Sequence, residues 1–220
     1  MPSQVRPAPA GSIARRVRQK EETRARILDA ARELFVLNGI EATTMRAIAS
    51  RIEYTPTAIY HHFRDKEALI EELCYLDFRA LAAALIQIGE IPDPLERVKR
   101  MGVAYCDFGL TNTSQYRFMF MTQTAHQTVN PERIEKNNPE QDAYGFLVMT
   151  VEEGLRRGLF RPEFQDEHQL AQLFWSGLHG MVSLFIAKAD DPWIEWRDPR
   201  ATIRLLIDVM IRGTRRHGAL

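Results

Sequence analysis

Apolar positions recur at helical spacing in the first part of the chain. Five of them lie at i, i+3, i+4, i+7 and i+8 of one helix face: Ile27, Ala30, Ala31, Leu34 and Phe35. The pattern begins near residue 21 and ends at Asn38-Gly39, where the glycine suits the left-handed position that follows a helix. We therefore predict a first helix over residues 21–38.

Three further helix starts follow closely. Thr43 or Thr44 is positioned to cap a second helix, whose inner face comprises Met45, Ile48, Ala49 and Ile52. Thr55-Pro56 places a capping threonine before a proline at the first helical position, which predicts a third helix over residues 56–62. Asp65 then caps a fourth helix that continues to the proline break at residues 92–94. Two short helices joined by three residues and packed on a longer one form a helix-turn-helix unit.

The remainder of the chain is also helical by pattern. Helices are expected over residues 94–111, 114–121, 141–157 and 200–216, and another begins after the capping pair Asp166 and Gln169. Residues 122–139 and 190–199 are polar or rich in proline, which predicts loops. Because no alternating strand pattern and no hairpin signal occurs, we predict an all-α fold.

Composition describes an ordinary soluble protein of 220 residues, of which 45% are hydrophobic and 26% charged. No run of 18 apolar residues and no apolar signal-peptide core occurs, so we expect no membrane span. The two cysteines, Cys74 and Cys106, stand alone in apolar segments. A disulfide framework is therefore not expected, and a reducing cytoplasm fits the sequence.

Charge is unevenly distributed although the net charge is zero. Residues 1–66 carry 12 Lys and Arg against 7 Asp and Glu, whereas the rest carries 17 against 22. The first 20 residues contain no acid and five cations: Arg6, Arg15, Arg16, Arg18 and Lys20. Since residues 1–14 are rich in proline, alanine and serine, we predict a disordered basic arm over residues 1–20. Such an arm is either an electrostatic footprint for a polyanion or a solvated tail.

Histidines raise the question of metal or catalytic chemistry. His61 and His62 are adjacent in YTPTAIYHHFRDKEAL, and neighbours on a helix point about 100° apart, which does not suit a shared ion. His126 and His168 have no supporting spacing, and the chain contains no G-x-S-x-G motif, phosphate-binding loop or His/Glu zinc motif. We therefore expect no metal, no cofactor and no enzymatic activity.

The outer face of the predicted third helix indicates a different role. It presents Thr55, Thr57, Tyr60 and His61, which are hydrogen-bonding groups suited to phosphate oxygens and base edges. We therefore predict that double-stranded DNA is a partner.

The segment RARILDAARELFVLNGIEATTMRAIASRIEYTPTAIYHHFRDKEALI resembles the DNA-binding domain of TetR-family transcriptional repressors, over about residues 21–70. The resemblance implies phosphate contacts from Thr44, Tyr60 and Lys66, and a base or phosphate contact from Arg46. It also implies that three residues lie in the major groove: Thr55, Thr57 and His61.

The helix-turn-helix turn departs from the family pattern. Glu53 stands where the family usually has glycine, and Tyr54 stands where a small aliphatic residue usually follows. A residue other than glycine at positive φ is strained, and an acid beside DNA is repulsive. This departure concerns the base contacts rather than the fold.

The second half carries a local resemblance. The stretch LFWSGLHGM, with Trp175, His179 and Gly180, resembles the C-terminal domain of the WHG-type subgroup of TetR regulators. This helix is apolar on more than one side, and the last helix is amphipathic through Ile203, Leu206, Ile207, Met210 and Ile211. We therefore predict a homodimer that joins these two helices to their copies in a four-helix interface.

Aromatic and methionine side chains in the second half are candidates for a ligand site. We predict that a small, mostly apolar or aromatic effector contacts seven residues: Tyr105, Phe108, Met119, Phe146, Met149, Trp175 and His179. For each of them ordinary core packing is the alternative, and for His179 the alternative is a hydrogen-bonded core histidine.

Together these features predict a basic arm (residues 1–20), a helix-turn-helix DNA-binding domain (21–67) and a larger helical ligand-binding and dimerisation domain (68–220). The function expected is a ligand-responsive transcriptional regulator in the cytoplasm. The alternative is a dimeric helical interaction protein that has lost DNA binding, for which Glu53 is the one indication.

Overall fold

The computed structural model describes residues 10–123 and 133–216, which form two compact units divided between Leu73 and Cys74. The described residues are helical apart from turns, loops and one isolated bridge between Phe160 and Arg215, so the predicted all-α fold is confirmed. The division lies six residues beyond the predicted domain boundary after residue 67 and falls inside helix α4 (Lys66–Leu85).

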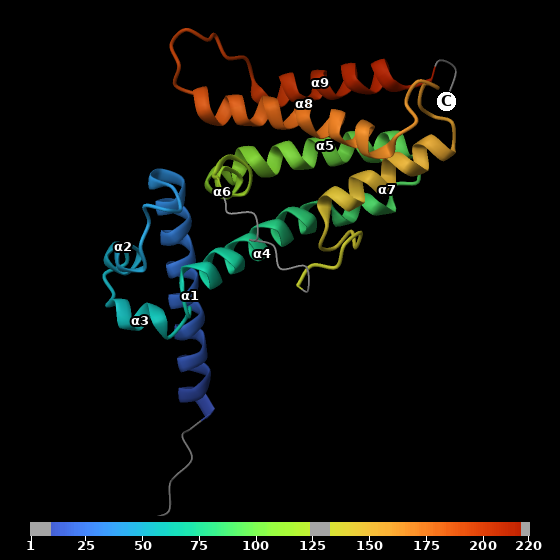
Figure 1. Cartoon of the computed structure of the whole chain (residues 1–220). Coiled ribbons are helices and arrows are strands. Elements are labelled where there is room, and N and C mark those ends of the chain that lie inside the picture. The colour runs from blue at the N-terminus through green and yellow to red at the C-terminus, as the bar shows by residue number, and fades with distance from the viewer. Residues whose placement is uncertain (1–9, 124–132, 217–220) are drawn as a thin grey trace, which may run out of the picture. The chain divides into compact units, whose positions relative to one another are not determined.

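The first unit contains α1 (Ala10–Asn38), α2 (Met45–Arg51), α3 (Pro56–Tyr60) and the beginning of α4. Figure 1 shows α2 and α3 on the same side of α1. Apolar side chains from all three helices have at most 1% of their surface exposed: Ile27, Ala31, Phe35, Ile48, Ala49 and Ile59. Because α3 has only five residues, it owes its stability to this burial rather than to its own hydrogen bonds.

Threonine and aspartate side chains fix the helix starts in this unit. The Thr44 and Thr55 hydroxyls accept hydrogen bonds from the backbone N–H of Ala47 and Ala58, and Asp65 accepts one from Ala68 at 2.7 Å. Gly39 takes a φ of +81° directly after α1. These caps are the ones that the sequence predicts.

Helix α1 starts earlier than the sequence analysis expects. It begins at Ala10, so residues 10–20 form three turns of helix rather than a disordered arm. The physical reason is that this stretch contains no proline after Pro9, and alanine, arginine, lysine and glutamine favour helix. Arg6 lies outside the described residues.

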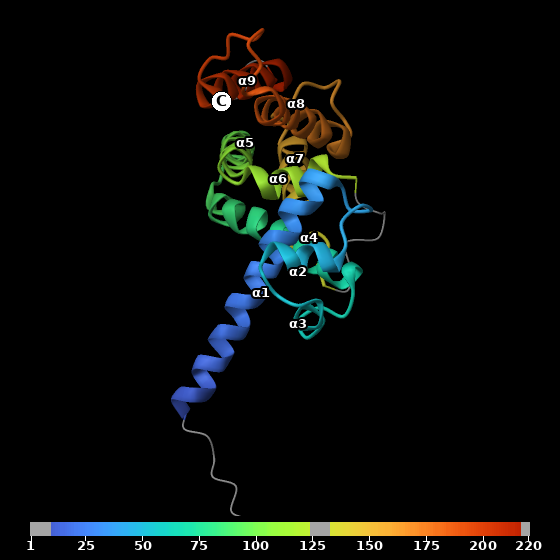
Figure 2. The ribbon, with the colours of Figure 1, turned by 90° about the vertical axis from the view of Figure 1, so that its left-hand side faces the viewer.

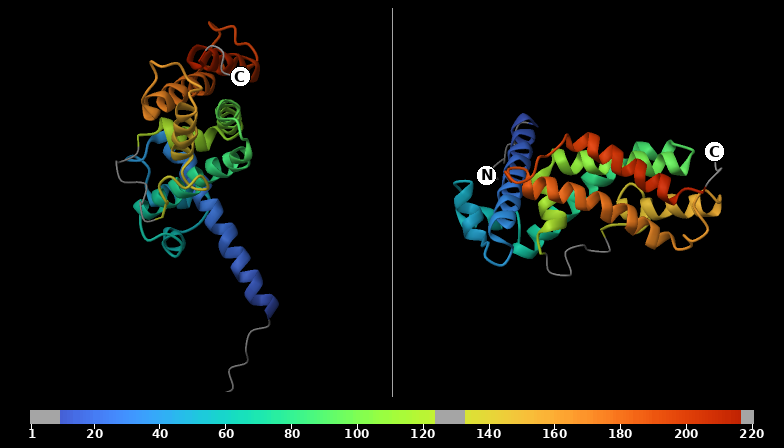
Figure 3. Two further views of the ribbon diagram at one scale, coloured as in Figure 1. Left: turned by 90° about the vertical axis from the view of Figure 1, so that its right-hand side faces the viewer. Right: turned by 90° about the horizontal axis from the view of Figure 1, so that it is seen from above.

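The second unit is built around α5 (Pro94–Thr111), which packs against α7 (Ala143–Arg156), α8 (Glu167–Lys188) and α9 (Pro199–Thr214). Figure 3 shows α8 and α9 running side by side, and the two helices are in contact. A short 3₁₀ helix, η1 (Ile86–Glu90), follows α4, and α6 (Thr113–Met121) follows α5.

Close approach of helices in this unit depends on Gly109 of α5. A Cβ atom at Gly109 would lie 2.7 Å from side-chain atoms of both Tyr116 on α6 and Val182 on α8, closer than packed atoms tolerate. Tyr116 and Val182 are fully buried. Three helices therefore meet at a position where only glycine leaves enough room.

Helix α8 is the one helix in the described ranges that is long and apolar enough to cross a membrane, with 22 residues and a mean hydropathy of 1.4. Its residues Leu170, Phe174 and Leu178 are buried in the core of the second unit. In all, 33% of its apolar window is buried within the unit, and core helices of soluble proteins also pass this test of length and composition.

Candidate functional site

The outer face of the helix-turn-helix motif carries the predicted DNA-contacting residues. Six of the seven have exposed side chains: Thr44, Arg46, Thr55, Thr57, Tyr60 and His61. They come from the start of α2 and from α3 with its C-cap. The motif therefore exposes, on one short stretch of backbone, hydroxyl, imidazole and guanidinium groups that donate hydrogen bonds.

Lys66 is the exception, since it is half-buried and donates a hydrogen bond from Nζ to the Ile40 carbonyl at 3.0 Å. An ammonium group has three protons, so this contact leaves two for a phosphate. The bond also ties the start of α4 to the loop after α1.

The turn between α2 and α3 is strained as the sequence predicts. Glu53 has a φ of +62°, in the left-handed region that favours glycine. The ring of Tyr54 lies 5.3 Å from the Arg26 guanidinium, which also donates to the Ile52 carbonyl at 3.2 Å. Arg26 therefore supports this turn from α1, and the side chain of Glu53 is exposed.

His62 has an environment unlike that of His61. Burial first, and then the positive charges of Lys20 and Arg24, lower the pKa of His62. Its Nδ1 atom is buried without a hydrogen-bond partner among the described residues, and its carbonyl accepts from Arg24 at 3.2 Å. A neutral, half-buried imidazole beside two cations is a packing group rather than a general base. The described residues contain no cluster of three metal-ligating side chains, and His126 lies outside them.

The second unit contains a partly open cavity of about 540 Å³. Side chains of α4 to α9 and of residues 134–142 line it. Its interior wall is predominantly apolar and includes Phe78, Leu81, Val98, Met119, Phe120, Leu147, Phe174 and Leu178. A cavity of this size and lining accommodates an apolar molecule of drug-like size.

Three of the seven predicted ligand residues line this cavity, namely Tyr105, Met119 and Trp175. The other four do not line this cavity. Phe108 is buried in the main core, and Met149 is 43% exposed. Phe146 packs behind the wall against Leu85 and Met101.

His179 also lies behind the wall, at the end of a chain of hydrogen bonds. The Trp175 Nε1–H donates to the Tyr105 hydroxyl at 3.1 Å, the Tyr105 and Tyr116 hydroxyls are 2.8 Å apart, and the Tyr116 hydroxyl is 2.7 Å from His179 Nδ1. His179 is therefore half-buried and hydrogen-bonded to Tyr116, and it does not line the cavity.

Burial determines the protonation states of the side chains in this hydrogen-bond network. It raises the pKa of Tyr105 to about 12, raises the pKa of Tyr116 further, and lowers the pKa of His179. All members are thus neutral near pH 7. Tyr105 lines the cavity, and its hydroxyl contacts Trp175, Tyr116 and, at 3.4 Å, His179 Nδ1. Which of these contacts it donates to depends on which nitrogen of His179 carries the proton.

Several cavity residues are absent from the predicted set, including Phe78, Phe120, Tyr144 and Met210. A signal for Phe78 exists in the sequence, because Cys74, Phe78, Leu81 and Leu85 form an i, i+4, i+7, i+11 stripe. No comparable signal separates cavity wall from core on the other helices.

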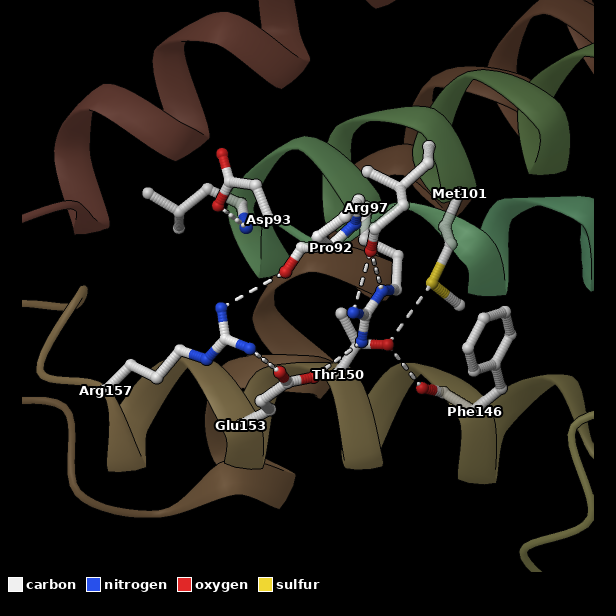
Figure 4. A network of polar contacts seen from close by, with 10 residues as sticks. Pro92, Asp93, Arg97, Met101, Phe146, Thr150, Glu153 and Arg157 are labelled. Atoms are coloured by element: carbon white, nitrogen blue, oxygen red, sulfur yellow. Dashed lines mark hydrogen bonds and ion pairs between the residues drawn. The ribbon is translucent and has the colours of Figure 1, made fainter. Parts of the chain in front are cut away.

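An ionic brace, shown in Figure 4, holds the segment between η1 and α5. Arg97 donates from Nε and Nη2 to the Ile91 carbonyl and from Nη1 to Glu153 at 2.7 Å. Arg157 contacts the other Glu153 oxygen at 2.5 Å and the Pro92 carbonyl at 3.1 Å. The Arg97 and Glu153 side chains are only 12% and 21% exposed, so this pair is shielded from solvent.

An apolar stripe remains exposed on α8 and α9. Leu205 and Val209 are more than half exposed, and Leu173 and Leu184 are about as exposed on α8. Leu206 and Met210, which belong to the stripe that the periodicity of the last helix identifies, pack against the core of their own unit. The exposed face of α9 therefore contains Leu205 and Val209, each one residue before Leu206 and Met210 of the predicted stripe.

Family models match both units of the chain. One described as bacterial regulatory proteins of the tetR family matches residues 27–73, and one described as a tetracyclin repressor-like C-terminal domain matches residues 98–210. The second description names no WHG subgroup, so that part of the expected resemblance is not confirmed.

Curated relatives are regulators of the same kind. The HTH-type transcriptional regulator UidR of Escherichia coli K12 is 46% identical over 65 residues, which are 29% of this chain and 33% of UidR. The match thus spans about a third of the length of that relative. The HTH-type transcriptional repressor KstR2 of Mycobacterium tuberculosis H37Rv is 27% identical over 150 residues, 66% of this chain and 72% of KstR2.

Solved structures share the fold. The TetR-family regulator PfmR from Thermus thermophilus superposes with a TM-score of 0.66 at 26% identity, covering 84% of this chain and 97% of PfmR. The ketosteroid regulator KstR2 of Mycobacterium tuberculosis gives a TM-score of 0.68 at 19% identity, covering 89% and 96%. These likenesses extend over both units.

The brace predicts a pH-dependent stability. The hydrogen bond from Arg97 is the main cause that lowers the pKa of Glu153 in the folded protein. The stabilisation that ionised Glu153 gives the folded protein is therefore complete above the pKa of an unfolded glutamate. It is lost as the pH falls through the lower pKa of the folded protein. Glu153→Gln should reduce the free energy of unfolding by about 1–3 kcal/mol at pH 7, and by much less at pH 3.

Urea unfolding at both pH values measures this difference. Glu163→Gln serves as the control, because it breaks an ion pair with Arg161 in which both side chains are more than 40% exposed. An equal loss of stability in the two variants at pH 7, or a loss at Glu153 that does not depend on pH, would contradict the role of the brace.

Proposed function

The chain belongs to the TetR family of bacterial regulatory proteins, and we propose on that premise that it is a transcriptional repressor that binds a palindromic operator as a homodimer. A small, mostly apolar or aromatic effector releases it. The observation that carries this proposal is an exposed helix-turn-helix surface in one unit and a partly open apolar cavity in the other. A DNA target in the chromosome implies a cytoplasmic location.

DNA recognition rests on α3 and the start of α2. Thr57 and His61 address base edges in the major groove together with Thr55, while Arg46 contacts a base or a phosphate. Thr44, Tyr60 and Lys66 hold the phosphate backbone on either side. The cap hydroxyls of Thr44 and Thr55 keep a free proton for DNA, because they accept rather than donate in the caps.

A homodimer explains the exposed stripe on α8 and α9. Gly180 of α8 lies on this face, and a Cβ atom there would meet nothing within 4 Å in its own subunit. Small and apolar residues at one helix face permit close packing of two copies in a four-helix interface. The resulting two-fold axis requires an operator with two-fold symmetry.

Effector chemistry follows from the cavity wall. The large apolar area favours a hydrophobic body, and the Tyr105 hydroxyl favours a single hydroxyl or carbonyl on it. KstR2 is a ketosteroid transcriptional regulator, and ketosteroids are molecules of this general kind. The polar group would reach Tyr105 first, and His179 only through the hydrogen-bond chain.

Release requires that the effector bind the DNA-free arrangement more tightly than the DNA-bound one. Phe78, Leu81 and Leu85 of the cavity wall belong to α4, whose first residues include Lys66. One helix thus carries both a ligand contact and a DNA contact. A coupling of about 1–3 kcal/mol, or about 5–150-fold in operator affinity, is sufficient.

The first test measures DNA binding. Tyr60→Phe should weaken binding to all DNA sequences alike by about 2–10-fold, because it removes one phosphate hydrogen bond. Thr57→Val should instead alter the preference among sequences. Gel-shift titrations with DNA upstream of its own gene measure both effects, and Tyr75→Phe in the second unit is the control. A folded, dimeric protein without salt-sensitive DNA binding would favour the alternative of an interaction protein.

The second test concerns the dimer. Leu205→Glu combined with Val209→Glu, and separately Gly180→Leu, should give monomers with poor operator affinity, because each change blocks close packing of two copies. Light scattering measures the mass. Leu37→Glu, at a residue of α1 that is 76% exposed, is the control for an exposed leucine outside the interface. Intact dimers in all variants would contradict this interface.

The third test uses a matched pair of probes, 4-phenylphenol and biphenyl. Tyr105→Phe should reduce the preference for the hydroxylated probe by about 2–10-fold, because one hydrogen bond is lost while the apolar wall is unchanged. Thermal shift and Trp175 fluorescence measure both affinities. If Tyr105→Phe and the control Tyr75→Phe leave the same preference, the polar anchor lies elsewhere; if bound probes never alter operator affinity, release by this route fails.

A further inference from the structure

The first turns of α1 extend beyond the part of the helix that packs against the helix-turn-helix motif. Every residue over 13–22 is exposed, and Thr23 is the first with a buried side chain. At about 1.5 Å per residue, residues 10–22 form a helical arm about 20 Å long. Figure 2 shows this arm continuing α1 well past α3.

The arm is basic and its charges are unpaired. It carries Arg15, Arg16, Arg18 and Lys20 against two acids at its end, Glu21 and Glu22, so its net charge is +2, and residues 10–20 contain no acid. None of these four cations has an ion-pair partner among the residues that the structure describes. Only Ile13 and Val17 on it are large exposed apolar residues, so the arm lacks the broad apolar face of a membrane-surface helix.

The arm lies near the C-terminal end of α3. Arg16 and Lys20 lie at i and i+4 of a stripe that continues through Thr23 to Ile27, which is fully buried against the motif. Lys20 is close enough to His62 for its charge to lower the pKa of that histidine, and His62 directly follows the C-cap of α3. The arm therefore leaves the unit beside the end of the helix that reads DNA.

We propose that residues 10–22 form a second DNA-contacting surface, a basic helical arm that binds the phosphate backbone flanking the sequence read by α3. This inference rests on the proposed DNA-binding function. A helix without packing contacts is marginally stable in water, and phosphates that pair with its arginines supply the missing stabilisation. Because its cations contact only the phosphate backbone of DNA, the arm increases the affinity of the protein equally for every DNA sequence.

The experiment compares full-length protein with the triple variant Arg15→Gln, Arg16→Gln, Arg18→Gln. Operator and random-sequence affinities are measured over a range of salt concentrations. Each lost phosphate contact should lower the slope of log affinity against log salt by about 0.9, so three contacts in each subunit amount to about 5 in the dimer. Affinity for operator and random DNA should fall by the same factor.

The control removes three cations that are exposed on the second unit, through Arg100→Gln, Arg156→Gln and Arg212→Gln. It loses the same net charge and should retain the wild-type slope. Circular dichroism and light scattering verify that both triple variants are folded and have the wild-type mass.

Three outcomes overturn the proposal. A triple arm variant with the wild-type slope shows that the arm does not touch DNA, while the regulator function stands. An unchanged slope together with lost binding to phosphatidylserine vesicles assigns the arm to an anionic membrane surface. A wild-type protein without salt-dependent DNA binding refutes the proposed function and this inference with it.

Discussion

The helix-turn-helix unit depends on one constraint: α3 has five residues and cannot be stable alone. Neighbouring residues stabilise it by burial, by a helix cap and by a hydrogen bond beyond its end. Ile59 is fully buried, Thr55 caps the first turn, and Arg24 holds the carbonyl of His62 just beyond the last one. The buried side of α3 is thus fixed by α1 and α2, which leaves its exposed side free to carry polar groups that add nothing to stability.

The second unit meets the opposite demand, because it must stay folded around a void of about 540 Å³. Side chains that line a cavity have fewer packing partners than side chains of a continuous core. Rigid aromatic rings and a closed hydrogen-bond chain offset that loss on one side, where Tyr105, Tyr116 and Trp175 support one another. On another side the shielded Arg97–Glu153 pair fixes the backbone behind Met101, which is itself part of the wall.

Local chemistry explains how much the sequence predicts. Helix starts depend on neighbouring residues, so the caps at Thr44, Thr55 and Asp65 and the strained turn at Glu53 are visible in it. The cavity depends on distant residues. Periodicity identifies Tyr105 and Phe108 alike as inward residues of α5, yet only the packing of other helices decides that one meets the cavity and the other the core. The predicted start of α1 is wrong for a different reason, since average composition over residues 1–14 conceals the helix-forming residues after Pro9.

The two ends of α4 are held by different contacts. The segment that follows its C-terminal end is fixed, because Arg97 and Arg157 bind the carbonyls of Ile91 and Pro92. The cavity touches the helix nearer its middle and end, at Phe78, Leu81 and Leu85. The N-terminal end of α4 is held within the first unit, where Lys66 donates to the Ile40 carbonyl and the side chains of Leu69 and Leu73 are fully buried. Helix α4 therefore contributes side chains to both units, and an effector in the cavity would contact it through Phe78, Leu81 and Leu85.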